Sequence, residues 1–351
     1  MIKRKDDEKM TKYIRLSLSE NPNSFPEKIK ERIKKEIDDI NLYPMDYYDE
    51  VKNILGKSYN LNKNNIYITN GSDEAIFFSL LTFGKQNGKV LISKKTFDGY
   101  VCSAKALKLN FEEVDLVDFK VDLNAIKKSI DDNVTLIYIC NPHNPTGTIL
   151  RKNDLIEFIS YCSLRKIKVV VDEAYMEYSR SDNSVIDFIN DFDNLIVIKT
   201  FSKLYPMAGI RFGFLLSNTE NIKKISTLKM LPYNVNRLAC VTAIECLKDS
   251  IFLETILKNN DDMKQYVYQE LNKLDIEYLK SNTNFIMIKF PANIPNFAKI
   301  LLEKYRVEIK DLSELGLNMY GRLTLGKKEE MDVVFKSILT IKNNYKIEVK
   351  G

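Results

Sequence analysis

Short apolar runs alternate with longer amphipathic stretches through the first two thirds of the chain. The runs are rich in β-branched and aromatic residues, which favours strands; they lie at 66–69, 89–93, 135–140, 168–172, 195–199 and 211–217. The stretch 153–166 has helical apolar spacing and predicts a helix between two of these strands. Strands that are apolar on both faces and alternate with helices indicate an α/β fold with a mostly parallel sheet.

The pattern changes after about residue 245. It predicts a long amphipathic helix over about 250–274, then strands at 284–290, 307–310 and 322–326 and helices near 296–305 and 328–343. This order indicates a smaller α+β domain. The polar residues 1–15 predict a loose arm, and 26–40 predicts a helix. We therefore divide the chain into 1–40, an arm and helix packing on the small domain, a large domain at 41–245, and a small C-terminal domain at 246–351.

Composition removes several classes of function. The net charge is 53 − 48 = +5 over 351 residues, and the basic runs are broken by acids, which favours a solvated surface over a nucleic-acid stripe. No run reaches the roughly 18 apolar residues of a membrane helix, and no signal peptide is predicted. The five cysteines (102, 140, 162, 240 and 246) form no CxxC pair, which is typical of reduced, mostly buried thiols in the cytoplasm.

The chain has a single histidine, His143, so a multi-histidine metal site is excluded and we expect no metal. Cys140 lies three residues away, which leaves a Cys–His pair open. The sequence contains no GxSxG, Walker A or GxGxxG motif. These absences turn attention to lysine chemistry.

Lys203 lies in TFSKLYPMAGIRFG (200–213), between the apolar runs 195–198 and 212–216. Upstream, VVVDEAY (169–175) ends a buried strand at Asp172. A carboxylate is costly to bury unless it is paired. An amine and a carboxylate at strand ends suggest an aldehyde cofactor bound as a Schiff base, its ring nitrogen paired with Asp172. A surface turn at Lys203, and a helix cap or Mg²⁺ ligand at Asp172, are the alternatives.

Other polar positions fit the same ligand. NGSDEA (70–75) opens a helix and offers an anion site at Ser72 and Asp73, with plain helix capping as the alternative. NPHNPTG (141–147) fixes Asn144 in a rigid turn, which could equally be structural. Core packing is the alternative for Tyr100 and Tyr175. A phosphate ester would suit the side chains flanking Lys203, which are Thr200, Ser202 and Arg211.

Together these stretches resemble the fold-type I, class I/II pyridoxal-phosphate aminotransferases, and within them most resemble the histidinol-phosphate aminotransferases. The matching stretches span nearly the whole chain: SENP (19–22), LYP (42–44), TNGSDEA (69–75), NPHNPTG, VVVDEAY, KTFSK with AGIRFGF, and RLTLG (322–326). The resemblance implies the pyridoxal-phosphate transferase fold of type I. This fold has a large domain with a mostly parallel seven-stranded sheet and a smaller α+β domain.

The resemblance also implies residue roles. Lys203 forms the Schiff base with pyridoxal 5'-phosphate and moves the proton, Asp172 pairs with the ring nitrogen, and Asn144 and Tyr175 bind the ring oxygen. Tyr100 stacks on the ring. The phosphate is surrounded by Ser72, Asp73, Thr200, Ser202 and Arg211. Tyr43 reaches the neighbouring site of a homodimer. Arg322 holds the anionic end of the substrate, and Asn21 lines the substrate side.

The implied reaction moves an amino group from a donor such as glutamate to a 2-oxo or phosphorylated oxo acceptor. The resemblance places this reaction in amino-acid biosynthesis in the cytoplasm, with histidine as the first candidate product. Two departures stand out: the arm is short and lacks a Pro-Tyr segment, and Lys310 stands where the family tends to have arginine, a better bidentate phosphate ligand. A decarboxylase resembling the threonine-phosphate decarboxylases, an aromatic or other amino-acid aminotransferase, and a non-catalytic cofactor-binding regulator remain alternatives.

Overall fold

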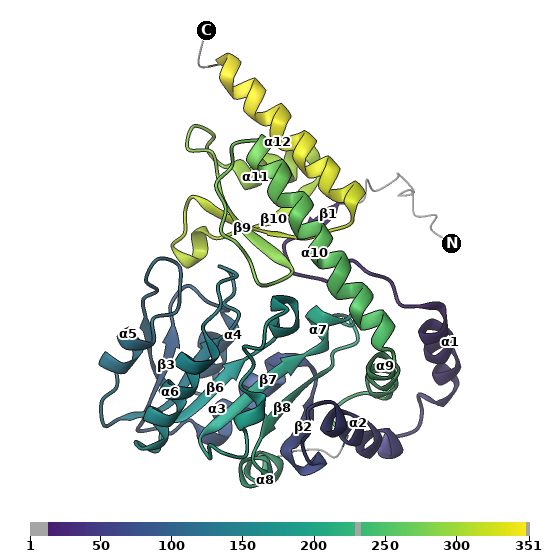
Figure 1. The fold of residues 1–351 in the computed structure, drawn as a ribbon, viewed down its shortest axis with the longest axis vertical. Coiled ribbons are helices and arrows are strands. Elements are labelled where there is room, and N and C mark those ends of the chain that lie inside the picture. Colours follow the sequence, from purple (N-terminus) through teal and green to yellow (C-terminus); the bar gives the residue numbers. More distant parts are fainter. Residues whose placement is uncertain (1–12, 229–232, 349–351) are drawn as a thin grey trace, which may run out of the picture.

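Two sheets organise the computed structural model, which describes residues 13–228 and 233–348 (Figure 1). The larger sheet has the strand order β2–β8–β7–β6–β5–β3–β4. In that order the strands are Ile66–Thr69, Gly213–Ser217, Leu195–Thr200, Lys168–Asp172, Val134–Cys140, Lys89–Ser93 and Asn110–Val114. β8 runs antiparallel to both neighbours, and the other adjacent pairs are parallel. The predicted α/β class with a mostly parallel seven-stranded sheet is confirmed.

The hydrophobic pattern does not predict the edge strand β4. Its sequence, NFEEV, exposes Asn110 and Glu113 and buries only Val114. An edge strand pairs on one side and tolerates polar side chains that face solvent. Its place in the sheet is defined by backbone pairing with β3. Backbone pairing does not require alternating apolar residues, so the sequence carries no such pattern here.

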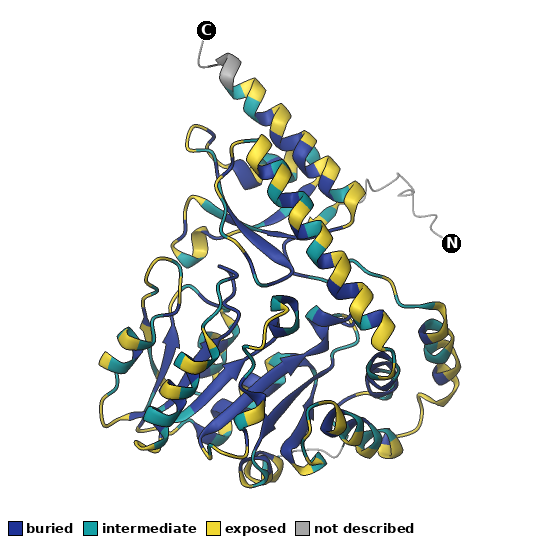
Figure 2. Cartoon of the chain, in the orientation of Figure 1, coloured by how far each residue is buried: buried dark blue, intermediate teal, exposed yellow. Residues whose placement is uncertain are grey.

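Helices cover both faces of the large sheet. One face carries α3 (Gly71–Phe83), α4 (Gly99–Ala106) and α8 (Thr219–Thr227). The opposite face carries α2 (Met45–Ser58), α5 (Leu123–Lys128), α6 (Lys152–Ser163) and α9 (Arg237–Lys248). Side chains alternate between these two cores along β6, because Val169 and Val171 face one and Val170 the other. The central strands are accordingly buried along their length (Figure 2).

The smaller sheet has the order β1–β10–β11–β9. Its strands are Ile14–Leu16, Val307–Asp311, Tyr320–Thr324 and Phe285–Lys289. Its core is closed by α10 (Ser250–Lys273), α11 (Phe297–Tyr305) and α12 (Lys328–Glu348). Short 3₁₀ helices lie at Ile37–Asp39, Lys63–Asn65, Met176–Ser179, Ile186–Phe188 and Ser313–Leu315.

The N-terminal segment differs from the sequence-based prediction at two points. Residues 1–12 of the predicted loose arm lie outside the described residues, and Ile14–Leu16 form β1, paired in parallel with β10. The helix predicted to pack on the small domain is α1 (Glu27–Glu36), which instead contacts α9 and buries Ile29 in the core of the large sheet. The domain boundaries remain a prediction, since α10 joins the two cores.

No helix within residues 13–228 and 233–348 is long and apolar enough to cross a membrane. All five cysteines are free thiols, and four of them are buried, as the sequence predicts. The fifth, Cys102, is exposed on α4.

A buried ion cluster lies beside the carboxyl ends of β6 and β7. Lys199 is 5% exposed, and its Nζ lies 2.6 Å from Glu177 Oε1 and 3.3 Å from Glu173 Oε2. Glu173 is fully buried and also accepts hydrogen bonds from the Ser184 hydroxyl and the Val185 N–H. Since Glu173 follows the last residue of β6 and Lys199 is the penultimate residue of β7, the cluster fixes both strand ends.

Replacing this lysine tests the cluster. We expect Lys199→Met to lower the free energy of unfolding by about 3–5 kcal/mol, because it leaves the buried Glu173 carboxylate without its cation. The control Lys152→Met removes pairs with the exposed Asp182 and Asp187 and should cost about 1 kcal/mol or less. Urea denaturation measures both, and equal losses would contradict this account of Lys199.

Candidate active site

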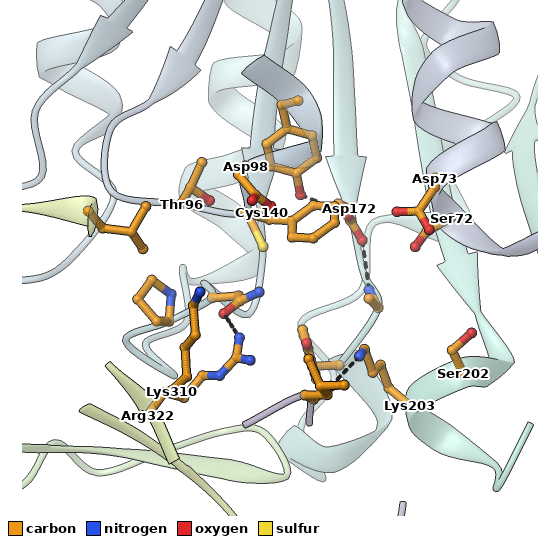
Figure 3. Close-up of a pocket in the computed structure, with 18 of the residues that line it drawn as sticks. Ser72, Asp73, Thr96, Asp98, Cys140, Asp172, Ser202, Lys203, Lys310 and Arg322 are labelled. Carbon is orange, nitrogen blue, oxygen red and sulfur yellow. Dashed lines mark hydrogen bonds between the residues drawn. The ribbon is translucent and has the colours of Figure 1, made fainter. Parts of the chain in front are cut away.

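A cavity of about 330 Å³ lies where the carboxyl ends of the central strands face the small sheet (Figure 3). Cys140 and Asp172 end β5 and β6 at its wall, Lys203 follows β7, and Lys310 and Arg322 reach it from β10 and β11. Of the predicted site residues, those that line it are Ser72, Asp73, Tyr100, Asn144, Asp172, Tyr175, Ser202, Lys203, Arg211 and Arg322. The fold thus gathers ten of them at one edge of the sheet, where α/β folds bind ligands.

Asp172 is a buried carboxylate with two donors. It is 4% exposed. Its Oδ2 accepts the Tyr100 hydroxyl at 2.7 Å, and its Oδ1 accepts the Ala174 N–H at 3.0 Å. Burial raises the pKa of Asp172 to about 6, although both hydrogen bonds act in the opposite direction. A carboxylate in such a site favours a cationic partner, which would compensate the cost of burial.

Lys203 lies in α7 (Phe201–Leu204), a single turn that directly follows β7. Its carbonyl accepts the Tyr178 hydroxyl at 2.7 Å, and its Nζ donates to the Leu18 carbonyl at 2.8 Å. Burial and, to a smaller extent, the charge of Arg322 lower the pKa of Lys203 to about 8. An appreciable fraction of the amine is therefore neutral just above pH 7, and a neutral amine is a nucleophile.

Arg211 and the start of α3 form a polar end of the cavity. Arg211 Nη1 donates to the Ser202 hydroxyl at 3.2 Å, and Nη2 lies 2.8 Å from Asp73 Oδ2. Gly71 has a φ of +76°, and a Cβ there would lie 2.5 Å from Arg211 Nη2, so only glycine leaves the guanidinium in place. Ser72 and Asp73 belong to the first turn of α3, where backbone N–H groups favour anions.

Arg322 and Asn144 meet across the opening between the two sheets. Arg322 Nη1 donates to Asn144 Oδ1 at 2.5 Å, and Nη2 donates to the Ser17 carbonyl at 2.6 Å. Within the described chain, Arg322 Nε has no hydrogen-bond partner, and the guanidinium lies 5.1 Å from the Phe285 ring centroid. Because Asn144 accepts through Oδ1, its amide N–H groups are the donors available to a ligand.

The aromatic side chains divide into two kinds. Tyr175 lines the cavity and packs edge-on against Phe285, with 5.1 Å between ring centroids. Tyr100 is 1% exposed, and its ring contacts Phe97 at 5.6 Å and Tyr138 at 5.0 Å. Tyr100 also lines the cavity, and its hydroxyl and its ring both have protein partners there; its stacking on a cofactor ring stays a prediction. Phe97 is half-buried and lines the cavity.

Three predicted site residues do not line the cavity. The Thr200 hydroxyl accepts the Ser202 N–H and donates to the Phe212 carbonyl, so it caps α7. Asn21 Nδ2 donates to the Leu204 carbonyl at 2.7 Å, which holds the other end of α7. Tyr43 is 76% exposed. Local structure accounts for the first two, since both side chains satisfy backbone groups of the α7 turn.

Sequence reasoning missed several residues of the cavity wall. The loop after β3 supplies Thr96, Phe97 and Asp98, and its position at a strand's carboxyl end was the available signal. Leu18, Leu312, Glu314 and Leu315 also line the cavity. Lys310, noted as a departure from the family pattern, does lie in the wall, with its Nζ 3.5 Å from Glu314 Oε2.

The structure does not favour the alternative of a Cys–His pair. Cys140 Sγ lies 3.4 Å from the Pro142 carbonyl, and His143 Nδ1 lies 2.9 Å from the Thr146 hydroxyl. Burial raises the pKa of the Cys140 thiol to about 12 and lowers the pKa of His143 to about 3. A thiol that stays protonated is a poor nucleophile. Among the described residues, no group of three or more His, Cys, Asp or Glu side chains could hold a metal ion.

One known protein family matches most of the chain. The family described as aminotransferase class I and II matches residues 11–338. The chain therefore belongs to the class I and II aminotransferases, and its fold is that of this class of enzyme.

Within that class, the chain is similar to histidinol-phosphate aminotransferases. The one from Caldicellulosiruptor saccharolyticus is 32% identical over 324 residues, which cover 92% of this chain and 89% of the relative. The structure of the Clostridium acetobutylicum histidinol-phosphate aminotransferase superposes with a TM-score of 0.86 at 26% identity, covering 94% and 99% of the two chains. The Sinorhizobium meliloti enzyme, solved in complex with pyridoxal-5'-phosphate, has a TM-score of 0.88 and covers 94% and 91%, but at 20% identity it shows the shared fold alone.

Proposed function

We propose that this protein is a pyridoxal-phosphate-dependent aminotransferase of the histidinol-phosphate type. The observation that carries the proposal is the composition of one cavity of about 330 Å³. It holds the Lys203 amine, whose pKa is lowered, the buried Asp172 carboxylate, and the Arg211 guanidinium, which is hydrogen-bonded to Ser202. One ligand with an aldehyde, a basic ring nitrogen and a phosphate group would engage all three. The names of the relatives support the same class of reaction and a place in histidine biosynthesis.

The residues of the cavity fit such a cofactor. Lys203 would hold its aldehyde carbon, and the Asp172 carboxylate would pair with its ring nitrogen. Ser202 and Arg211 would hold its phosphate group together with the first turn of α3, whose Gly71 keeps space for the guanidinium. Asp73 keeps Arg211 in position through its ion pair.

Two further groups would orient the ring. Asn144 can donate through its amide and Tyr175 through its hydroxyl, and both would meet the ring oxygen. Phe97 is placed to contact the ring face, and Tyr100 lies behind it against Asp172. When bound, pyridoxal phosphate supplies an electron sink for the bonds at the substrate's α-carbon.

Lys203 would also move the proton during transfer. Its pKa of about 8 is close to working pH, so the amine exchanges a proton with little driving-force penalty. Its Nζ lies inside the cavity, tied to the Leu18 carbonyl by a hydrogen bond that a ligand can replace.

Arg322 would hold the anionic end of the substrate, because its Nε has no partner among the described residues and its guanidinium faces the cavity. Lys310 lies beside it on the neighbouring strand, in register with Arg322. These two cations support an acceptor that carries a phosphate or a second carboxylate. The donor is an amino acid such as glutamate.

A substrate panel tests this assignment. Purified protein with added pyridoxal phosphate is offered glutamate and a set of oxo acceptors, and separately histidinol phosphate with 2-oxoglutarate. We expect transfer, fastest with the phosphorylated substrate. Carbon dioxide release from a phosphorylated amino acid without an oxo acid would indicate the decarboxylase alternative. A preference for aromatic amino acids would change the substrate, and cofactor binding without turnover would indicate a regulator.

The protein is proposed to act as a homodimer in the cytoplasm. Five large apolar side chains of one short segment are exposed, which is typical of a surface that binds another chain; they are Ile37, Ile40, Leu42, Tyr43 and Met45. The family resemblance gives Tyr43 the role of reaching the phosphate group in the partner's site. The five free thiols support a reducing compartment.

Removing the Tyr43 hydroxyl tests that role. We expect Tyr43→Phe to remain dimeric by light scattering and to bind pyridoxal phosphate about 10-fold more weakly, because a hydrogen bond to a charged group is lost. Tyr13→Phe is the matched control, since Tyr13 is also exposed but its hydroxyl contacts Arg306, the residue that follows α11. A monomeric wild type, or equal affinities in both variants, would refute the dimeric site.

A further inference from the structure

The Tyr100 hydroxyl donates a hydrogen bond to the Asp172 carboxylate. The hydroxyl lies 2.7 Å from Asp172 Oδ2, and the two side chains are 1% and 4% exposed. The ring is held between Phe97 and Tyr138, so the hydroxyl has a fixed direction. Burial and the neighbouring carboxylate raise the pKa of Tyr100 well above its usual value, so it is a donor at every working pH.

Asp172 therefore has one donor from the chain on each oxygen, since Ala174 N–H binds the other. The titratable groups that interact with this pair are Asp73 on α3, Glu173 directly after β6, Cys140 and Tyr138 on β5, and Tyr175. Lys203 and Arg322 line the same cavity. The nearby acids Asp73 and Glu173 raise the pKa of Asp172 further, which makes a neutral donor important for keeping its charge.

We propose that Tyr100 is a positioning residue for the reaction: its hydroxyl keeps the Asp172 carboxylate ionised and oriented toward the ring nitrogen of the cofactor. This inference rests on the proposed function and adds a role beyond it. Without the hydroxyl, the carboxylate becomes more basic, and the proton shared with the ring nitrogen moves toward Asp172. The ring then carries less positive charge and withdraws electrons less strongly.

The test compares Tyr100→Phe with Tyr138→Phe. Tyr138 is equally buried and its ring packs at a tilt against that of Tyr100, but its hydroxyl contacts Ser79 and the Ile76 carbonyl. In cofactor-free protein, carboxyl ¹³C NMR should show the Asp172 pKa rising by about one unit in Tyr100→Phe, because a hydrogen bond to a charged acceptor is lost. In the loaded protein, kcat should fall about 10-fold with KM within twofold, and the pH midpoint of the visible cofactor band should rise. Tyr138→Phe should shift none of these.

A second background separates positioning from folding. In Asp172→Asn, adding Tyr100→Phe should leave the midpoint of the cofactor band unchanged, because the hydroxyl acts through the carboxylate. The proposal is overturned if the Asp172 pKa does not move in Tyr100→Phe, if Tyr138→Phe shifts it equally, or if the band shift persists in the Asp172→Asn background. A wild type with no visible band would refute the proposed function instead, while the NMR titration would still decide the role of Tyr100.

Discussion

Lys203→Ala is expected to abolish amino transfer, lowering kcat by about 10⁴-fold or more. The variant loses both the amine that would link to the cofactor and the base that would move the substrate proton. The amine is held at the cavity by its hydrogen bond to the Leu18 carbonyl and by α7, which the Thr200 side chain caps. Kinetics with a saturating donor, together with the absorption spectrum in added pyridoxal phosphate, measure the two losses separately.

The loss should be chemical and not structural. Lys203 Nζ makes one hydrogen bond to the chain, so the free energy of unfolding should change by about 1 kcal/mol. Lys310→Ala is the matched control, because Lys310 is a second lysine of the same cavity. It should keep the visible cofactor band and raise the KM for a phosphorylated acceptor. Normal turnover in Lys203→Ala, or loss of the band in Lys310→Ala, would overturn the assignment of the amine.

Asp172→Asn should lower the activity and raise the stability of the cofactor-free protein, and both effects should be large. Activity should fall by roughly 10²–10⁴-fold, because an amide cannot carry the negative charge that keeps the ring nitrogen protonated. The cofactor-free protein should become more stable at pH 8. Asp172 has no cationic partner within hydrogen-bond distance there, and the substitution removes a charge from a site that is 4% exposed.

The sign of the pH dependence follows from the raised pKa. In the folded protein Asp172 has a pKa of about 6, against 3.8 for the exposed group. Between these values the folded state binds more protons than the unfolded state, so stability falls as the pH rises. The difference of about two units corresponds to about 3 kcal/mol lost above pH 6.

Denaturant unfolding of cofactor-free protein at pH 4 and pH 8 measures this effect. The stability gain of Asp172→Asn over the wild type should be present at pH 8 and small at pH 4. Asp154→Asn, at an exposed carboxylate paired with Arg151, should show no such gain. A variant that is less stable than the wild type at pH 8 would contradict this account, because it would show that protein groups already stabilise the buried Asp172 charge.

The central part of the fold could be predicted because it is built from apolar residues with a simple period. Val169, Val170 and Val171 are buried on alternating faces, so β6 and the position of Asp172 at its end follow from the sequence. Strand ends of a parallel sheet meet at one edge, which is why residues as distant as Ser72 and Lys203 share a cavity.

The remaining features depend on contacts that a hydrophobic pattern does not encode. β4 is an exposed edge strand, and β1 is three residues long and defined by pairing with β10. Asn21 and Thr200 each lie three residues from a residue of the cavity wall, Leu18 and Lys203 respectively. Their side chains nevertheless bond to backbone groups of α7. Tyr100 and Phe97 are both aromatic, lie three residues apart and both line the cavity, and only packing shows that Tyr100 is the one that contacts Asp172.

The most direct test of the account is the site at which the cofactor attaches. The wild-type protein is loaded with pyridoxal phosphate, reduced with borohydride to make an imine link permanent, digested and mapped by mass spectrometry. The account predicts one pyridoxyl group for each chain, carried by Lys203. A protein that carries no adduct, or carries it on Lys310 or a surface lysine while Lys203 is unmodified, would contradict it.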